Sequence, residues 1–109
     1  MAWQSKNISP EITELSQGIC SVGVDQNFAI VDFSARSIPY RIHLLYNFLR
    51  TFIYLDKLYI ITELEIFQLN KYTFELIATY DLPNLFENIA ARNNQIEVKC
   101  IDSVTIHIN

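Results

Sequence analysis

The chain has 109 residues, half of them apolar, with seven Phe, six Tyr and only two Gly. This content of large apolar side chains favours a packed core over disorder, and the length predicts a single domain, residues 1–109. So few glycines exclude a glycine-rich phosphate loop and a flexible linker. The formal net charge of −4 disfavours nucleic acid as a partner, because phosphate binding needs a basic face.

The first predicted element is a short helix over residues 9–18, SPEITELSQG. Ser9 is a suitable N-cap and Pro10 suits the first helical position. Glu11 is favoured near the positive end of the helix dipole. Gly18 could end the helix in the left-handed conformation.

From residue 19 onward, apolar and polar residues alternate with a period of two, which is typical of half-buried strands. β-branched and aromatic residues dominate each run, and Asp, Asn, Lys and Ser separate the runs. We therefore predict about eight short strands. The runs are 19–24, 28–33, 40–46, 51–55, 58–62, 64–69, 74–80, 95–100 and 104–108.

Two segments are open to a second interpretation. Residues 41–49, RIHLLYNFL, fit helical spacing as well as a strand, and we favour the strand. Residues 84–91 could form a helical turn with Asn84 as N-cap, or a strand. The predicted fold class is all-β, an antiparallel β-meander with a short N-terminal helix. An α+β fold is the alternative if either segment is helical.

The order of strands and turns repeats at an offset of 36 to 38 residues, a period that stacked sheets such as propeller blades show. Residues 56–83, DKLYIITELEIFQLNKYTFELIATYDLP, resemble a blade of the quinoprotein-like β-propellers, and the resemblance extends over residues 52–108. The Trp and Gly usual in such blades are absent from residues 56–83, so the resemblance implies no cofactor site here. A propeller needs at least four blades and this chain supplies about two. We expect a small sandwich, an open barrel, or a blade-like fragment that closes a ring by self-association.

The sequence offers little catalytic chemistry. Cys20 and Cys100 lie in apolar runs, which favours buried free thiols over a disulfide or a metal site. His43 and His107 alternate with aliphatic residues and have no metal-ligand spacing, so a structural role is favoured. No serine nucleophile elbow occurs. We predict a non-enzymatic protein without a metal or cofactor.

The negative charge is concentrated in residues 55–90, which carry six acidic and two basic residues, while the flanking segments are balanced. Glu63 and Glu65, two apart in a strand, are predicted to share one face, with Glu75 joining them across a turn. The alternatives are a binding surface for a basic partner and an ordinary solvated sheet face.

Asp56 and Asp81 near the turns extend the predicted acidic surface, and Tyr59 and Tyr72 are candidate anchors for a partner. Tyrosine side chains could equally pack in the core. The predicted binding residues are therefore Asp56, Tyr59, Glu63, Glu65, Tyr72, Glu75 and Asp81.

The favoured function is a small acidic protein-binding module. Its most concrete form is an immunity or inhibitor protein that covers a basic toxin or nuclease domain. The alternatives are a self-associating scaffold built through sheet edges and a small-ligand-binding β-domain. The N-terminal residues lack the apolar core of a signal peptide, and no apolar run reaches the roughly 18 residues of a membrane helix. We therefore expect a cytoplasmic protein, with a homo-oligomer as one outcome.

Overall fold

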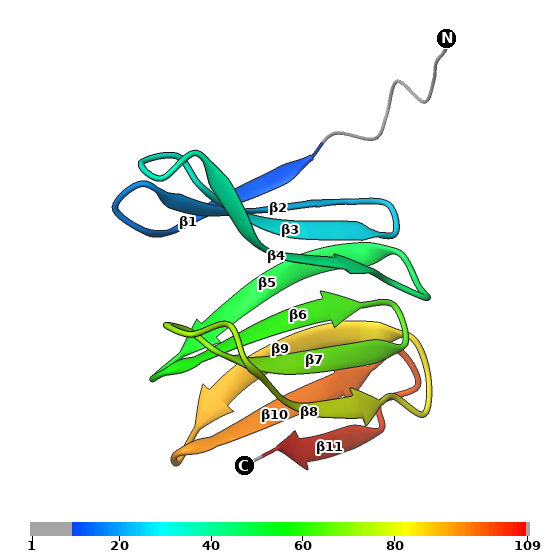
Figure 1. Cartoon of the computed structure of the whole chain (residues 1–109). Helices are drawn as coiled ribbons and strands as arrows, with labels where there is room; N and C mark the ends of the chain where they lie inside the picture. The colour runs from blue at the N-terminus through cyan, green and yellow to red at the C-terminus, as the bar shows by residue number, and fades with distance from the viewer. Residues whose placement is uncertain (1–9, 109) are drawn as a thin grey trace, which may run out of the picture. The chain divides into compact units, whose positions relative to one another are not determined.

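The computed structural model describes residues 10–108, which form eleven β-strands (Figure 1). The strands are β1 (Glu11–Ser16), β2 (Ile19–Val24), β3 (Asn27–Asp32), β4 (Ser37–His43), β5 (Phe48–Tyr54), β6 (Lys57–Thr62), β7 (Glu65–Asn70), β8 (Leu76–Asp81), β9 (Phe86–Arg92), β10 (Gln95–Cys100) and β11 (Thr105–Ile108). The all-β prediction is confirmed. Within these described residues there is no helix, and hence none long and apolar enough to cross a membrane.

The strands form three antiparallel sheets in which each strand pairs with its neighbour in sequence. Their orders are β1-β2-β3-β4, β5-β6-β7-β8 and β11-β10-β9. Over residues 10–108 the sheets do not close into a barrel. A four-stranded antiparallel sheet of this kind is also the building unit of a propeller blade. The chain divides into two compact units, residues 1–50 and 51–109, and the single domain stays a prediction.

The predicted N-terminal helix is wrong. Residues 11–16 form the edge strand β1, which pairs with β2 from Glu11 opposite Gly23 to Ser16 opposite Ile19. A helix of two turns has little stability of its own, whereas pairing with β2 satisfies the backbone groups along one side of β1. Gly18 still adopts a positive φ of 79°, but in the turn between two strands. The proposed N-cap, Ser9, lies outside the described residues.

The two ambiguous segments are not helical either. Residues 84–91 contribute to the strand β9, and residues 41–49 end β4, turn, and begin β5. Two backbone hydrogen bonds hold that turn beside the β2–β3 loop. The amide of Leu44 donates to the carbonyl of Gln26, and the amide of Phe48 donates to that of Asp25, both at 2.6 Å. Strands β1 and β9, which lie outside the nine runs predicted as strands, raise the count above the eight or so expected.

The first unit buries one face of its sheet around Phe28. The Phe28 ring lies 5.6 Å from that of Phe48 and 6.5 Å from that of Tyr40, between centroids. Gly23 stands opposite Phe28 in the adjacent strand, and the ring of Phe48 lies where a Cβ on Gly23 would be. The aromatic cluster therefore requires glycine at residue 23.

The second unit has the larger core, which lies between the sheet β5–β8 and the sheet β9–β11. Its buried members are Tyr59, Ile61, Ile66, Leu82, Ile89, Ile96, Val98, Cys100 and Ile108. A buried polar chain crosses three strands: the amide of Gln68 donates to the Tyr59 hydroxyl at 3.0 Å and accepts from the Tyr80 hydroxyl at 3.1 Å. Because each of these polar groups has a partner, burying them is tolerated.

Strands β6 and β7 are buried on both faces. Successive residues of a strand point to opposite faces, yet the residues of β6 from Leu58 to Thr62 and of β7 from Ile66 to Leu69 are all buried. Their sequences, KLYIIT and EIFQLN, accordingly approach the continuous apolar runs of doubly covered strands.

Tight two-residue turns link several strands. Asn93 and Asn94 both have positive φ, at 53° and 63°, and join β9 to β10 as the hairpin turn with two left-handed residues that favours Asn and Gly. Leu55, the first residue of the β5–β6 turn, also has a positive φ of 56°, although leucine rarely adopts it. Its side chain is 69% exposed, so packing does not compensate for the strain.

We expect Gly23→Ala to lower the free energy of unfolding by about 1–3 kcal/mol, the usual effect of overpacking a core. Urea unfolding followed by tyrosine fluorescence measures it. In a Phe48→Leu background the same substitution should cost less, because the ring that meets the new Cβ is gone. Equal losses in both backgrounds would contradict the packing argument.

We expect Leu55→Gly to raise the free energy of unfolding by about 1 kcal/mol, because glycine adopts the left-handed conformation without strain. Leu55→Ala is the matched control, since it removes the exposed side chain but keeps the Cβ that causes the strain. Thermal unfolding of both variants checks this. A stabilisation by alanine equal to that by glycine would show that the side chain, not the backbone, is responsible.

Candidate partner-binding surface

The predicted binding residues are divided between the two ends of the second unit's sheets. Consecutive strands run in opposite directions, so the loops after β6 and β8 share one end, and the loops after β5 and β7 share the other (Figure 1). Glu63, Glu65 and Asp81 lie at the first end, and Asp56, Tyr72 and Glu75 at the second. A six-residue strand separates the ends by about 17 Å. The prediction that these residues form one continuous acidic face is therefore wrong.

We call the first end the acidic end and define it by residues 63–65, 81–86 and 101–104. Backbone hydrogen bonds hold these segments together. The amide of Leu82 donates to the carbonyl of Leu64 at 2.9 Å. The amide of Phe86 donates to the backbone carbonyl of Glu63 at 2.8 Å, and the amide of Ile101 donates to the carbonyl of Leu85 at 2.9 Å. The loop after β8 thus binds the β6–β7 turn on one side and the β10–β11 turn on the other.

Thr62 fixes the turn that carries the two glutamates. Its hydroxyl donates to the carbonyl of Glu65 at 2.7 Å and accepts from the amide of the same residue at 2.9 Å. Glu63 lies in this turn and β7 begins only at Glu65, so the two do not follow one another along a single strand.

The acidic end carries four carboxylates, from Glu63, Glu65, Asp81 and Asp102, and its three segments contain no Lys or Arg. Glu65 and Asp81 are direct cross-strand partners. Partial burial, and secondarily the charge of Asp81, raises the pKa of Glu65 above its usual value. The protein therefore holds like charges side by side, an arrangement that a cationic partner would relieve.

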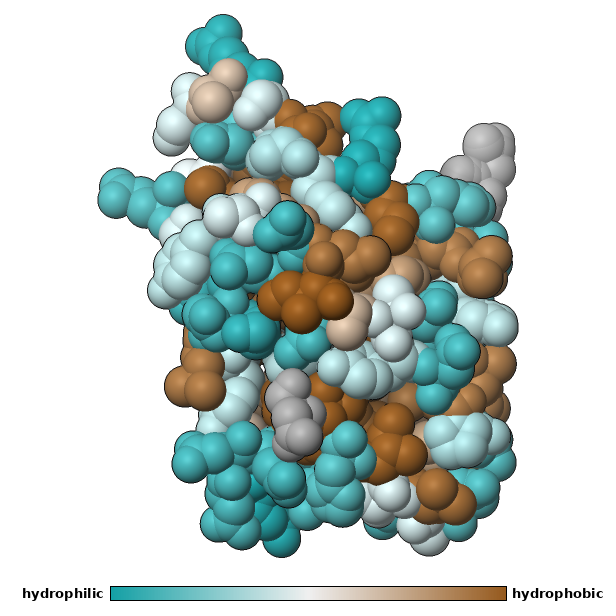
Figure 2. All heavy atoms as spheres, turned by 60° about the horizontal axis from the view of Figure 1, so that its bottom comes forward, coloured by the Kyte–Doolittle hydropathy of each residue, from teal (hydrophilic) through white to brown (hydrophobic). Residues whose placement is uncertain are grey.

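Apolar side chains are exposed between these carboxylates. Leu85, Ile101 and Val104 are 41%, 54% and 42% exposed. They come from the two loops that the Ile101–Leu85 hydrogen bond joins. Figure 2 shows a face of the molecule on which hydrophobic and hydrophilic residues are interspersed. An apolar contact ringed by charge is typical of a protein-binding surface.

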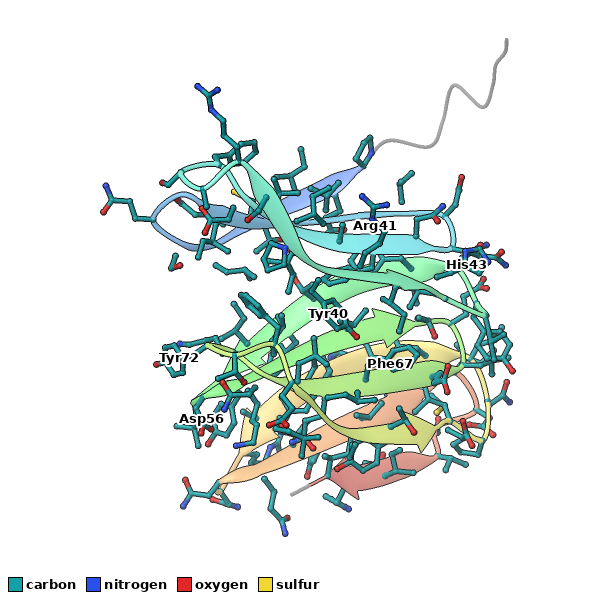
Figure 3. The ribbon with its side chains drawn as sticks, viewed as in Figure 1. Tyr40, Arg41, His43, Asp56, Phe67 and Tyr72 are labelled. Atoms are coloured by element: carbon teal, nitrogen blue, oxygen red, sulfur yellow. The ribbon has the colours of Figure 1, made fainter. Side chains whose placement is uncertain are left out.

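The opposite end has mixed charge. The ammonium group of Lys57 contacts the carboxylate of Asp56 at 2.6 Å, and this hydrogen bond lowers the pKa of Asp56. Tyr72 is 70% exposed and its ring lies under the Lys71 ammonium group, 5.1 Å from the centroid. Figure 3 shows Asp56 and Tyr72 at this same end. The amide of Lys71 donates to the carbonyl of Asp56 at 2.9 Å and joins the two turns.

Tyr59 is not available as an anchor. Its side chain is only 2% exposed, its ring centroid lies 6.2 Å from that of Phe52, and its hydroxyl accepts a hydrogen bond from Gln68. Burial also raises the pKa of Tyr59 above the usual value of a tyrosine. The alternating pattern around Tyr59 misleads because β6 is buried on both faces, so neither side of the strand faces solvent.

The remaining candidate residues are the two cysteines and the two histidines. Cys20 is half-buried and Cys100 buried, and both are free thiols, as expected. The Nδ1 atom of His43 lies 3.5 Å from the side-chain oxygen of Asn27, and the Nε2 atom of His107 lies 3.4 Å from the Glu97 carboxylate. Across residues 10–108, no three His, Cys, Asp or Glu side chains group so as to hold a metal ion.

Sequence reasoning missed Asp102 and the three exposed apolar residues of the acidic end. The motif around Asp102, Ile-Asp-Ser, indicated only a turn. The Asp102 carboxylate does act as a turn acceptor, for the amide of Val104 at 3.2 Å. Its nearness to the β8–β9 loop depends on a hydrogen bond between residues 16 positions apart, which no local pattern reveals.

No family model matches the chain, and no curated protein matches its sequence. Among solved structures, it is similar to the computationally designed Ika4 protein, with a TM-score of 0.68 and 9% identity over 90% of this chain. It is also similar to Sqt1 of Saccharomyces cerevisiae, with a TM-score of 0.63 and 13% identity over 84% of the chain. Hsv2 of Kluyveromyces lactis follows with a TM-score of 0.50 and 14% identity over 93%.

The chain spans 65%, 28% and 33% of the lengths of these three structures. At such low identities the likeness shows the fold alone. The resemblance of residues 52–108 to quinoprotein-like blades stays a prediction.

Proposed function

We propose that the protein is a non-enzymatic binding module whose acidic end binds a basic face of another protein. One observation carries this proposal: four carboxylates and no Lys or Arg lie in the segments that form this end. The opposite end carries three basic and two acidic residues in residues 55–57, 70–75 and 92–95. The acidic end thus accounts for the whole net charge of the chain.

The arrangement supports both association and retention of such a partner. Concentrated charge of one sign speeds encounter with a partner of the opposite sign. The exposed side chains of Leu85, Ile101 and Val104 offer apolar contact once the partner has docked. The concrete form of the proposal is an inhibitor or immunity-type protein that covers the basic active site of a toxin or nuclease domain.

The first test uses a peptide in which Lys and Arg alternate with Leu, and a control peptide with Glu in place of the basic residues. We expect only the basic peptide to shift backbone amide NMR signals, and the shifts to cluster in residues 63–65, 81–86 and 101–104. Raising the salt concentration should weaken this binding. Shifts centred on residues 70–75, or equal binding of both peptides, would contradict the proposal.

Charge reversal gives the second measurement. The double variant Glu63→Lys/Glu65→Lys should bind the basic peptide about tenfold more weakly or worse, because each exposed ion pair contributes up to about 1 kcal/mol. The matched control, Glu11→Lys/Glu75→Lys, changes the net charge equally but alters no residue of the acidic end. Isothermal titration calorimetry compares the two. Similar affinities would show that net charge alone governs binding.

A binding surface of clustered carboxylates should reduce stability when no partner is bound. Because the pKa of Glu65 is raised in the folded protein, the folded state holds this proton more tightly than the unfolded chain. Stability contributed by this group is present below its ordinary pKa and is lost as pH rises through the raised one. We therefore expect Glu65→Gln to be more stable than the natural protein at neutral pH.

The advantage of Glu65→Gln should disappear below about pH 4, where the natural carboxyl is protonated in both states. Urea midpoints measured across this pH range check the sign. Glu75→Gln, at the opposite end, is the control for the loss of one negative charge. A Glu65→Gln variant less stable than the natural protein at neutral pH would refute the unfavourable environment inferred for the Glu65 carboxylate.

A further inference from the structure

The sheet β1–β4 has a second face that is apolar but only half-buried. Cross-strand partners share a face, and the pairs Ile12–Val22, Val22–Ala29 and Cys20–Val31 place these residues together. We call this surface the open face. Its members are Ile12, Glu14, Cys20, Val22, Val24, Asn27, Ala29, Val31, Arg41 and His43.

The open face has an apolar centre and a polar rim. The two central strands contribute Cys20, Val22, Val24, Ala29 and Val31, all half-buried. The charged groups lie on the edge strands, with Glu14 on β1 and Arg41 and His43 on β4. Figure 3 shows Tyr40 and Arg41 on opposite sides of β4, as the alternation of a strand requires. Buried interfaces have this same arrangement of apolar centre and polar rim.

The face also has a protrusion and a hollow. Ile12 on β1 is 63% exposed, and we refer to its side chain as the protrusion. On the β2–β4 side lies an open hollow of about 510 Å³, lined by Val22, Val24, Asn27, Phe28, Ala29, Arg41, Ile42 and His43. Ile12 stands at the same level along the strands as Ala29 and Arg41, because Ile12 pairs with Val22, Val22 with Ala29, and Ala29 with Arg41.

We propose that the open face is the interface of a homodimer, in which two copies stack face to face. A two-fold axis parallel to the strands, between β2 and β3, places β1 of one copy over β4 of its partner. This rotation does not change the position of any residue along the strand direction. Ile12 of each copy then enters the hollow of the other. The protrusion and the hollow occur on one surface in the positions that self-recognition requires.

The charges fit the same operation. Glu14 comes over β4 of the partner copy, which carries Arg41, and the reverse contact forms on the other side of the axis. Along the strand direction, Glu14 and Arg41 are two residues apart, about 7 Å, a distance that an arginine side chain spans. An axis perpendicular to the strands would instead place β1 over β1 and β4 over β4, so that edge strands carrying like charges would face each other. Charge complementarity therefore selects the parallel axis.

A head-to-tail arrangement, in which the open face of one copy packs on the sheet β9–β11 of another copy, fits less well. The partly exposed face of that sheet is charged. Glu97 lies 3.8 Å from Arg92 and 3.4 Å from His107, and Lys99 pairs with Asn88 and Thr105 in register. Covering this face with valines would remove these charges from water without compensation. The like-to-like stack, in which the open faces of two copies pack on each other, buries apolar surface against apolar surface.

Sedimentation equilibrium over micromolar to millimolar concentrations tests the proposal. We expect a reversible monomer–dimer equilibrium. Ile12→Ser should weaken dimerisation by about a hundredfold, because two isoleucine side chains lose their burial per dimer and each contributes at least a factor of ten. Ala90→Lys, on the face of β9 with the Arg92–Glu97–His107 cluster, is the matched control and should leave the equilibrium unchanged.

A charge exchange tests the two-fold axis. Glu14→Arg and Arg41→Glu should each weaken the dimer, and the combined variant should restore it to within about threefold of the natural protein, because the cross-axis pairs re-form with exchanged signs. Cys20 gives a readout without mutation: its alkylation by iodoacetamide should slow as protein concentration rises, with the buried Cys100 as the slow reference.

A protein that stays monomeric at millimolar concentration would overturn the proposal, whether a small apolar ligand or a different protein then proves to cover the open face. A dimer that Ala90→Lys disrupts as strongly as Ile12→Ser does would overturn the like-to-like stack. Circular dichroism and the thermal midpoint of each variant establish that it is folded, so that loss of the dimer is not loss of the monomer fold.

Discussion

The burial of both faces of β6 and β7 is the constraint on which the second unit depends. One face carries Tyr59, Ile61 and Ile66, which pack with the buried residues of β9–β11, and the other carries Leu58, Ile60 and Leu69. A strand covered twice has no face on which to expose a charged side chain at low cost. The carboxylates around β6 and β7 are therefore confined to strand ends and turns, where water reaches them. Gln68, whose long polar side chain lies in the middle of β7, is tolerated there because Tyr59 and Tyr80 form hydrogen bonds with it.

Antiparallel pairing then sorts the charges between two ends. Alternate turns share an end, so residues close in sequence such as Asp56 and Glu63 are separated by the length of a strand. Asp102 joins Glu63 and Asp81, although it is distant in sequence. The candidate binding surface is thus made of loops on a rigid scaffold, a common location for protein-binding sites. Its repulsion between Glu65 and Asp81 persists because the sheet register holds the two strands together.

In the sheet β1–β4, only one of the two faces contains fully buried residues. Its inner face holds Phe28 and Ile30, and its outer face repeats the apolar pattern with Val22, Val24 and Val31 half-exposed. Sheets of stacked folds have two apolar faces because each is covered twice. The proposed dimer would cover this partly exposed apolar face of the sheet.

The sequence by itself determined the all-β class, most strand positions, the turn within residues 25–27, the free thiols and the excess negative charge. The turn expected at residues 56–57 lies one residue earlier. These follow from local patterns of period two, turn residues and composition. It could not determine that residues 11–16 are a strand, because capping residues favour a helix locally and only pairing with β2 reverses the preference. Nor could it show that Tyr59 is buried while Asp102 joins the acidic end. Which face is covered, and which turns meet, depend on contacts between segments distant in the chain, and only the tertiary structure decides those.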